Sequence, residues 1–135
     1  MKNIIPFSQH PRLGNDLEYV KKILDNKKIF KEGFFSKKVE QLLKKQLHIR
    51  EKTLLTTSCT HALEIAAILI NLKPGDEVIV PSYTFVSSAL AFYMHGAKIV
   101  FADISPSTLN LDETKLEKII TKKTKAIIAV HYAGV

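Results

Sequence analysis

The side chains of this sequence that could do chemistry gather in four short segments, each placed directly after an apolar run. They carry hydroxyls, aromatic rings and one histidine, and they are Thr57-Ser58-Cys59-Thr60, Pro81-Ser82-Tyr83-Thr84-Phe85, Asp103-Ile104-Ser105 and His131-Tyr132-Ala133-Gly134. If the apolar runs are parallel strands, their carboxyl ends lie at the edge where open α/β sheets bind ligands. We therefore expect a binding site at that edge.

The first segment opens a helical stretch with small hydroxyl residues. The first turn of a helix has N–H groups without intrahelical partners and the positive end of the helix dipole, and both suit a phosphate. Ser58 and Thr60 add hydroxyl donors, and Thr60 could also cap the helix. A plain N-cap without a ligand explains the same residue types, so the spacing alone leaves both interpretations open.

The other segments carry aromatic, acidic and histidine side chains. Tyr83 or Phe85 could stack on a planar ring at the end of its strand, but packing of the following helix explains them equally well. Asp103 could simply cap a turn. His131 fits either a polar contact in the site or a histidine satisfied at a strand end.

Several classes of site lack their motifs in this sequence. There is no glycine-rich P-loop, no G-x-G-x-x-G and no G-x-S-x-G, which argues against a nucleoside-triphosphate enzyme, a standard dinucleotide fold and a nucleophile elbow. No group of His, Cys, Asp and Glu has metal-ligand spacing, and we predict no metal site. Cys59 is the single cysteine, so an internal disulfide is excluded.

The elements that must position these residues alternate between β-type and helical patterns. The β-type runs are Thr53–Thr56, Glu77–Val80, Lys98–Ala102 and Lys125–Val130, and the helical stretches are Thr60–Leu72, Thr84–His95 and Asp112–Thr121. This alternation predicts a parallel sheet with βαβ crossovers. The stretch Thr60–Leu72 is apolar almost all round and should be buried. The runs Glu77–Val80 and Ala126–Val130 should be covered on both faces.

The first 52 residues have a different character. We expect an extended arm over 1–15, helices over Asp16–Leu24 and Ser36–Leu47, and a polar connection at 26–33. The chain has a net charge of +7, and the region from Lys21 to Lys52, with eleven basic and four acidic residues, accounts for all of it. Such a region is either a solvated helix face or a surface that attracts an anionic ligand. It has none of the motifs of nucleic-acid recognition, and we expect no such partner.

Neither membrane nor secretion signals are visible. No apolar run reaches the roughly 18 residues that a membrane span needs, and the N-terminus has no apolar stretch and cleavage site typical of a signal peptide. With a single cysteine, these features favour a cytoplasmic protein with no membrane partner.

Read together, the motifs resemble one family over essentially the whole chain. In order, they are Ile5-Pro6-Phe7, Gly33-Phe34-Phe35-Ser36, Ser58-Cys59-Thr60-His61-Ala62-Leu63, Lys73-Pro74-Gly75-Asp76, Pro81-Ser82-Tyr83-Thr84-Phe85-Val86, Gly96-Ala97-Lys98-Ile99 and Val130-His131-Tyr132-Ala133-Gly134. This series resembles the DegT/DnrJ/EryC1/StrS sugar aminotransferases. The resemblance implies the N-terminal part of the fold-type I large domain, an incomplete pyridoxal-phosphate-binding domain over 53–135 with four strands, preceded by an arm and Lys-rich helices over 1–52.

The resemblance also implies an activity and its partners. Family members transfer an amino group from glutamate to a 4-keto-6-deoxy nucleotide sugar with pyridoxal phosphate, for surface polysaccharides, and they act as homodimers. The cofactor phosphate would lie at Ser58, Cys59 and Thr60, and Phe85 would stack on the pyridine ring. Phe34, Phe35 and His131 would lie on the substrate side.

The resemblance ends before the residues that carry the reaction. None of the 135 residues matches the motif of the Schiff-base lysine or of the acid that pairs with the pyridine nitrogen, so the lysine is placed beyond Val135. The chain alone is therefore expected to be inactive. Two alternatives remain: a dehydratase of the same family, with histidine in place of that lysine, and a truncated remnant without function.

Overall fold

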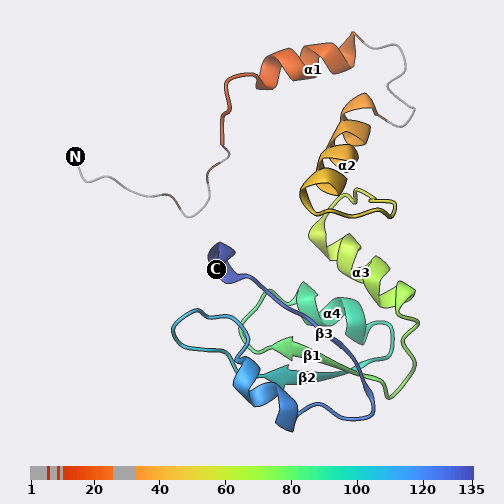
Figure 1. Cartoon of the computed structure of the whole chain (residues 1–135), viewed down its shortest axis with the longest axis vertical. Coiled ribbons are helices and arrows are strands. Elements are labelled where there is room, and N and C mark those ends of the chain that lie inside the picture. Colours follow the sequence, from red (N-terminus) through yellow and green to blue (C-terminus); the bar gives the residue numbers. More distant parts are fainter. Residues whose placement is uncertain (1–5, 7–8, 10, 26–32) are drawn as a thin grey trace, which may run out of the picture. The chain divides into compact units, whose positions relative to one another are not determined.

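The computed structural model describes residues 6, 9, 11–25 and 33–135. The chain forms two compact units, Met1–Leu55 and Thr56–Val135, and each has its own local structure (Figure 1). The second unit contains all of the strands in the described part of the chain. It is the unit that positions most of the predicted site.

A parallel three-stranded sheet forms the centre of the second unit. Its strands are β1 (Glu77–Pro81), β2 (Lys98–Ala102) and β3 (Thr124–Ile127), in the spatial order β2-β1-β3. Both neighbours run parallel to β1, with Glu77 opposite Lys98 on one side and Thr124 on the other. The predicted parallel α/β architecture is confirmed.

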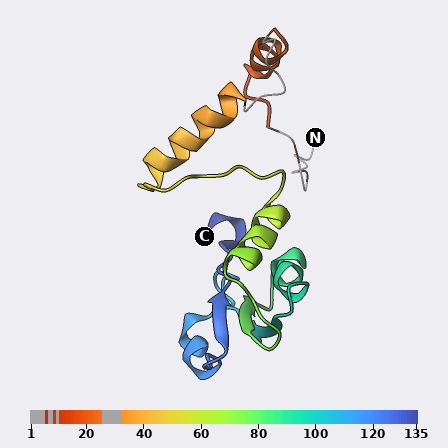
Figure 2. The ribbon, with the colours of Figure 1, turned by 90° about the vertical axis from the view of Figure 1, so that its right-hand side faces the viewer.

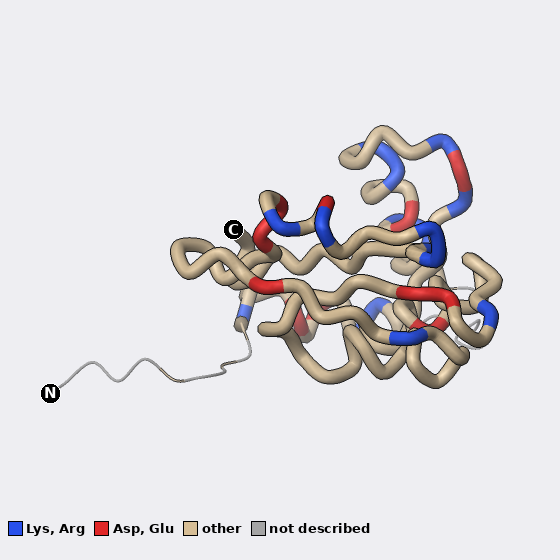
Figure 3. Tube along the Cα trace, turned by 90° about the horizontal axis from the view of Figure 1, so that it is seen from below, with Lys and Arg blue, Asp and Glu red and all other residues tan. Residues whose placement is uncertain are grey.

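Two helices cover one face of this sheet. They are α3 (Cys59–Leu69) and α4 (Ser87–Tyr93), which pack against each other and lie together in Figures 1 and 2. The core between helices and sheet consists of Val78 and Val80 from β1, Ala67 from α3, and Ala91 and Phe92 from α4. All five residues of β1 are buried, as the apolar pattern of Glu77–Val80 predicted. Glu77 is the one charged residue of β1, and Figure 3 colours the charged residues along the chain.

The expectation that the first helical stretch is buried is wrong. Only Ala67 of α3 is buried, while Ile68 and Leu69 are 61% and 78% exposed. The reason is geometric, because among the described residues of the second unit α3 packs against α4 and, through Ala67, against β1, and its other sides stay uncovered. An apolar surface of this kind on an isolated unit marks a face that other protein covers.

The helices α3 and α4 are shorter than the predicted stretches Thr60–Leu72 and Thr84–His95. Three further predicted elements also differ from the structure. Residues 53–56 form no strand, because no other strand in the described residues pairs with them. The last strand is shorter than predicted, and as an edge strand it leaves Ile127 42% exposed instead of covering both faces. The stretch after Asp112 forms a 3₁₀-helix, η1 (Glu113–Lys118), instead of a longer α-helix. Thr121 ends it early by bonding to the amide of Lys123 and to Glu77, which competes with helical hydrogen bonds.

The first unit contains two helices in its described part. They are α1 (Asp16–Leu24), which is confirmed to the residue, and α2 (Phe34–Gln46), which begins two residues before its predicted start. The predicted arm over 1–15 and the connection at 26–33 lie largely outside the described residues. The apolar side chains of α1 are exposed, so its amphipathic pattern has no covered face within this unit.

Two further points bear on the predicted organisation. The proposed division at residues 52 and 53 stays a prediction about functional domains. In the described part of the chain, no helix is long and apolar enough to cross a membrane.

Glu77 joins the amino ends of all three strand regions. Its carboxylate accepts a hydrogen bond from the Thr121 hydroxyl at 2.6 Å and pairs with the Lys98 ammonium at 3.3 Å. The hydrogen bond from Thr121 is the main cause that lowers the pKa of Glu77, and Lys98 adds to it against the opposing effect of burial. The ionised carboxylate is therefore the form that stabilises the fold.

This arrangement predicts an acid-dependent stability. A carboxyl whose folded pKa is lowered contributes stability above its unfolded pKa, and this contribution is lost as the pH falls through the folded pKa. Glu77→Gln is expected to flatten the dependence of the urea midpoint on pH below about 4.5. Glu117→Gln, at an exposed position of η1, is the matched control and should keep the wild-type acid dependence. Equal acid dependence in Glu77→Gln and wild type would refute this role.

Candidate functional site

The start of α3 is built by a side-chain cap. Ser58 is the N-cap residue in an extended conformation, and its hydroxyl accepts a hydrogen bond from the amide of His61 at 3.1 Å. The carbonyl of Ser58 accepts from the amide of Ala62 at 3.2 Å. Thr57 supports the same turn, because its hydroxyl bonds to the His61 ring. The sequence allowed Thr60 as the cap, and the structure places Ser58 there instead.

These bonds leave two donors at the helix start. Among the described residues, the amides of Cys59 and Thr60 have no acceptor, since the cap satisfies the next two amides of the turn. Both point out of the first turn, where the helix dipole is positive. The hydroxyl of Thr60 and the proton of the Ser58 hydroxyl are further donors. The donor set therefore fits a phosphate group.

The cap itself is testable by a pair of substitutions. Ser58→Ala should lower the free energy of unfolding by about 1 kcal/mol, because the amide of His61 loses its acceptor. Ser58→Asp keeps an acceptor at the cap and should unfold close to wild type in thermal melts followed by circular dichroism. A Ser58→Ala protein as stable as Ser58→Asp would show that the cap contributes nothing.

The segment after β1 presents an exposed aromatic ring. Phe85 is 74% exposed and precedes α4, and its carbonyl accepts from the amide of Ser88 at 3.0 Å. The hydroxyls of Thr84 and Ser88 bond at 2.9 Å and fix the same turn. Packing of the following helix therefore does not explain Phe85. Its ring is free to stack on a planar partner.

The segment after β3 meets the segment after β1. The hydroxyls of Tyr132 and Tyr83 lie 3.1 Å apart and their ring centroids lie 4.9 Å apart, although the residues are 49 positions apart in sequence. His131 is exposed, and its Nδ1 lies 3.1 Å from the carbonyl oxygen of Val135. Because a carbonyl oxygen only accepts, this bond places the proton on Nδ1 and leaves Nε2 of His131 available.

The segment after β2 makes structural contacts at the carboxyl edge of the sheet and presents no reactive group there. Asp103 forms an exposed ion pair with Lys115 at 3.0 Å, and its carbonyl accepts from the amide of Asp112. The carbonyl of Asp103 thus closes a turn, in the place where the sequence suggested a turn cap. Asn110 from the same loop bonds to the backbone of Tyr132 and of Val135.

The structure brings together the segments that follow β1, β2 and β3. The three strands are parallel, so Tyr83, Asp103 and His131 all follow the same edge of the sheet. Figures 1 and 2 both place the start of α3 and the C-terminal segment at the upper end of this unit. Phe34 and Phe35 belong to the first unit, where their rings contact edge to face at 5.4 Å. Their predicted place on the substrate side stays a prediction.

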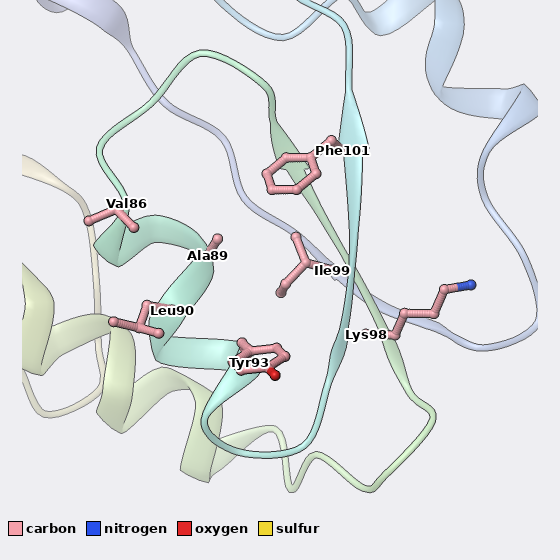
Figure 4. A pocket seen from close by; sticks show the side chains of 7 residues that line it. All are labelled: Val86, Ala89, Leu90, Tyr93, Lys98, Ile99 and Phe101. Atoms are coloured by element: carbon pink, nitrogen blue, oxygen red, sulfur yellow. The ribbon is translucent and has the colours of Figure 1, made fainter.

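An apolar hollow of 440 Å³ lies elsewhere, between α4 and β2 (Figure 4). It is lined mainly by Val86, Leu90, Tyr93, Ile99 and Phe101. Its only charged lining residue is Lys98, whose ammonium points away from the hollow in Figure 4. Binding sites for small molecules need a few converging polar groups. We therefore assign the hollow no ligand, and the site stays at the carboxyl edge.

Two residues of this edge were missed by sequence reasoning. Tyr132 was noted only as part of its segment, and Asn110 was not noted at all. The partner of Tyr132 lies 49 residues away, and no local pattern predicts that pairing. A turn-forming asparagine shortly after the turn residues Ser105-Pro106-Ser107 was the only available signal for Asn110.

Comparison with known proteins gives the same family that the motifs resemble. The sequence model of the DegT/DnrJ/EryC1/StrS aminotransferase family matches residues 13–135. A GDP-perosamine synthase of Caulobacter vibrioides is 39% identical over 125 residues, which cover 92% of this chain and 33% of that protein. The chain thus spans about a third of the length of this relative.

Solved structures agree with this match. PseC of Helicobacter pylori, an aminotransferase involved in the biosynthesis of pseudoaminic acid, superposes with a TM-score of 0.83 at 30% identity over 96% of this chain and 34% of that one. A GDP-4-keto-6-deoxy-D-mannose-3-dehydratase of Escherichia coli with bound hydrated PLP superposes with a TM-score of 0.76 at 28% identity, over 88% of this chain and 32% of that one.

Proposed function

The chain belongs to the DegT/DnrJ/EryC1/StrS aminotransferase family, and from this membership we propose that it forms the N-terminal third of a pyridoxal-phosphate-dependent aminotransferase of nucleotide sugars. The reaction is amino transfer from glutamate to a 4-keto-6-deoxy nucleotide sugar for surface polysaccharide. The start of α3 carries the proposal, because its two free amides and two hydroxyls form a phosphate-sized donor set in the unit that holds the sheet.

Pyridoxal phosphate fits the residues present. The amides of Cys59 and Thr60, with the hydroxyls of Ser58 and Thr60, would hold its phosphate, and Phe85 would stack on its ring. When bound, the cofactor supplies an electrophilic carbon and an electron-withdrawing ring that carry an amino group between substrates. The residues of this chain orient the cofactor; none of them is assigned the proton transfers.

The substrate side draws on other residues. Phe34, Phe35 and His131 are the proposed contacts of the nucleotide sugar, and Nε2 of His131, as an acceptor, suits a hydroxyl group of the sugar. The lysine that holds the cofactor is assigned to none of the 135 residues. We therefore expect the isolated chain to be inactive. From the family resemblance, we propose that the working form of the enzyme is a homodimer in the cytoplasm.

A dehydratase is the second candidate, because a dehydratase structure superposes on 88% of this chain. Dehydratase and aminotransferase would share the phosphate and ring contacts described here. They differ at the lysine position, which lies outside these residues. Both candidates therefore predict the same cofactor binding and different products.

The complete product of the gene that carries this sequence tests the proposal. It is incubated with ¹⁵N-glutamate and, in separate arms, dTDP- and GDP-linked 4-keto-6-deoxy sugars. The dTDP arm is included because the motifs resemble those of a dTDP-4-amino-4,6-dideoxygalactose transaminase, and the GDP arm because of the similarity to a GDP-perosamine synthase. We expect ¹⁵N in one sugar product by mass spectrometry. Loss of a hydroxyl without ¹⁵N would identify the dehydratase. An unchanged sugar in both arms would overturn the proposal.

A further inference from the structure

Tyr132 connects the segments that follow all three strands. Its hydroxyl lies 3.1 Å from that of Tyr83, and their rings contact with an interplanar angle of 44°. Its amide donates to the Oδ1 of Asn110 at 2.7 Å. The Nδ2 of Asn110 donates to the carbonyl of Val135 at 2.9 Å, so the asparagine holds the last segment at two points. Loops that are far apart in sequence are thus fixed to one another.

The loop that presents Asn110 is itself rigidly built. Its ends are joined by the bond from the amide of Asp112 to the carbonyl of Asp103 at 3.0 Å and by a bridge between Ile104 and Leu111. Leu109 has a φ of 61°, a left-handed conformation that is costly for a residue with a side chain. Such a conformation persists only where its surroundings enforce it, and here it precedes the asparagine that makes the contacts.

The network lies directly beside the proposed cofactor contacts. Phe85 is two residues beyond Tyr83, and His131 immediately precedes Tyr132. Both side chains are exposed, and each is joined through the backbone to the tyrosine of its segment. A shift of the Tyr83 or Tyr132 segment would therefore move the ring that stacks or the imidazole that faces the substrate.

We propose that Tyr83, Tyr132 and Asn110 are positioning residues, which hold Phe85 and His131 in register with the phosphate site at the start of α3. They touch neither cofactor nor substrate. Their effect on cofactor binding rests on the proposed function, whereas the network itself does not.

The tyrosine pair has a direct spectroscopic signature. The hydrogen bond to Tyr83 is the main cause that raises the pKa of Tyr132. The sequence has four tyrosines and no tryptophan, so phenol ionisation is visible by ultraviolet absorbance without interference. In Tyr83→Phe, Tyr132 should ionise at a lower pH than in wild type. Tyr93→Phe removes an exposed tyrosine of α4, and in this variant the pH at which Tyr132 ionises should not change.

The functional test compares two ligands in the complete gene product. Pyridoxamine phosphate probes phosphate and ring contacts together, and it has no aldehyde to react with surface lysines. Inorganic phosphate, used as a competitor, probes the start of α3 alone. Tyr83→Phe and Tyr132→Phe should each weaken pyridoxamine phosphate binding about fivefold, as expected for the loss of one hydrogen bond of about 1 kcal/mol. The affinity for inorganic phosphate should not change.

The double variant and the asparagine complete the test. Tyr83→Phe with Tyr132→Phe should cost no more than either single change, because both remove the same bond. Asn110→Asp keeps the acceptor for Tyr132 and loses the donor, so hydrogen exchange should quicken at 131–134 while the core stays protected. Wild-type affinity for pyridoxamine phosphate in both tyrosine variants, or additive losses in the double variant, would overturn the proposal. If the wild type binds no pyridoxamine phosphate while the phenol shift appears, the proposed function fails and the network stands.

Discussion

Phe92→Ala is expected to lower the free energy of unfolding by about 3–5 kcal/mol. Phe92 is 2% exposed and lies in the core between α4 and the sheet, against Val78, Val80 and Ala67. The core of the second unit is small and has few large side chains, so few neighbouring side chains can move in to fill the cavity that the lost ring leaves. A loss of this size is a large share of the stability of a domain. Urea unfolding followed by circular dichroism measures it.

The neighbouring residue supplies a matched control. Tyr93 is on the same helix, is also aromatic and is 63% exposed. Tyr93→Ala should change the free energy of unfolding by less than about 1 kcal/mol. Both variants place alanine in α4, so the change in helix propensity is nearly the same. The difference between their losses of unfolding free energy therefore reports the burial of Phe92. Equal losses in the two variants would contradict the position of the core.

Thr60→Asp is expected to weaken pyridoxamine phosphate binding by at least about a hundredfold. The change replaces a hydroxyl donor in the first turn of α3 by an anion facing the phosphate. Like charges in such proximity cost several kcal/mol. An acidic residue in the first turn of a helix is otherwise favourable, so α3 should be at least as stable as in wild type. Isothermal titration calorimetry on the complete gene product gives the affinity, and a thermal melt gives the stability.

Thr60→Asn separates charge from shape. Asparagine has nearly the size of aspartate and carries no charge, so it should lose at most about tenfold in affinity. If Asp and Asn weaken binding equally, the residue acts by shape and the phosphate lies elsewhere. If neither changes the affinity, the start of α3 does not bind the cofactor.

The central elements of the fold were predictable because their signals are local. The apolar run at Glu77–Pro81 is buried throughout. Gly96 lies in the turn between α4 and β2, with a φ of 89° that a residue with a side chain rarely adopts. The amphipathic pattern gave α1 its bounds. In each case a short stretch of sequence carries the signal, such as an apolar run or helical spacing of apolar residues, and the same stretch forms the element.

The errors arise where the outcome depends on a partner. A strand at 53–56 requires a neighbour, and within the described residues it has none. The burial of α3 requires a second covering layer, and Leu69 lies exposed without one. Both outcomes depend on a covering or pairing segment, which no local pattern in the sequence reveals.

The residues of the candidate site also fall into those that local sequence predicts and those that depend on contacts between distant segments. Ser58 and Thr60 could be predicted from helix-start chemistry, and the exposed ring of Phe85 favours its proposed role over simple packing. The contact between Tyr83 and Tyr132 could not be predicted, because it depends on how two loops approach in space. Asn110 was hidden for the same reason.

A structure of the complete gene product with pyridoxal phosphate bound is the measurement that tests this account most directly. We predict that the phosphate lies within hydrogen-bond distance of the amides of Cys59 and Thr60, with the ring of Phe85 stacked on the pyridine. A phosphate bound elsewhere, for example by the lysines of α2, with the start of α3 empty, would contradict it.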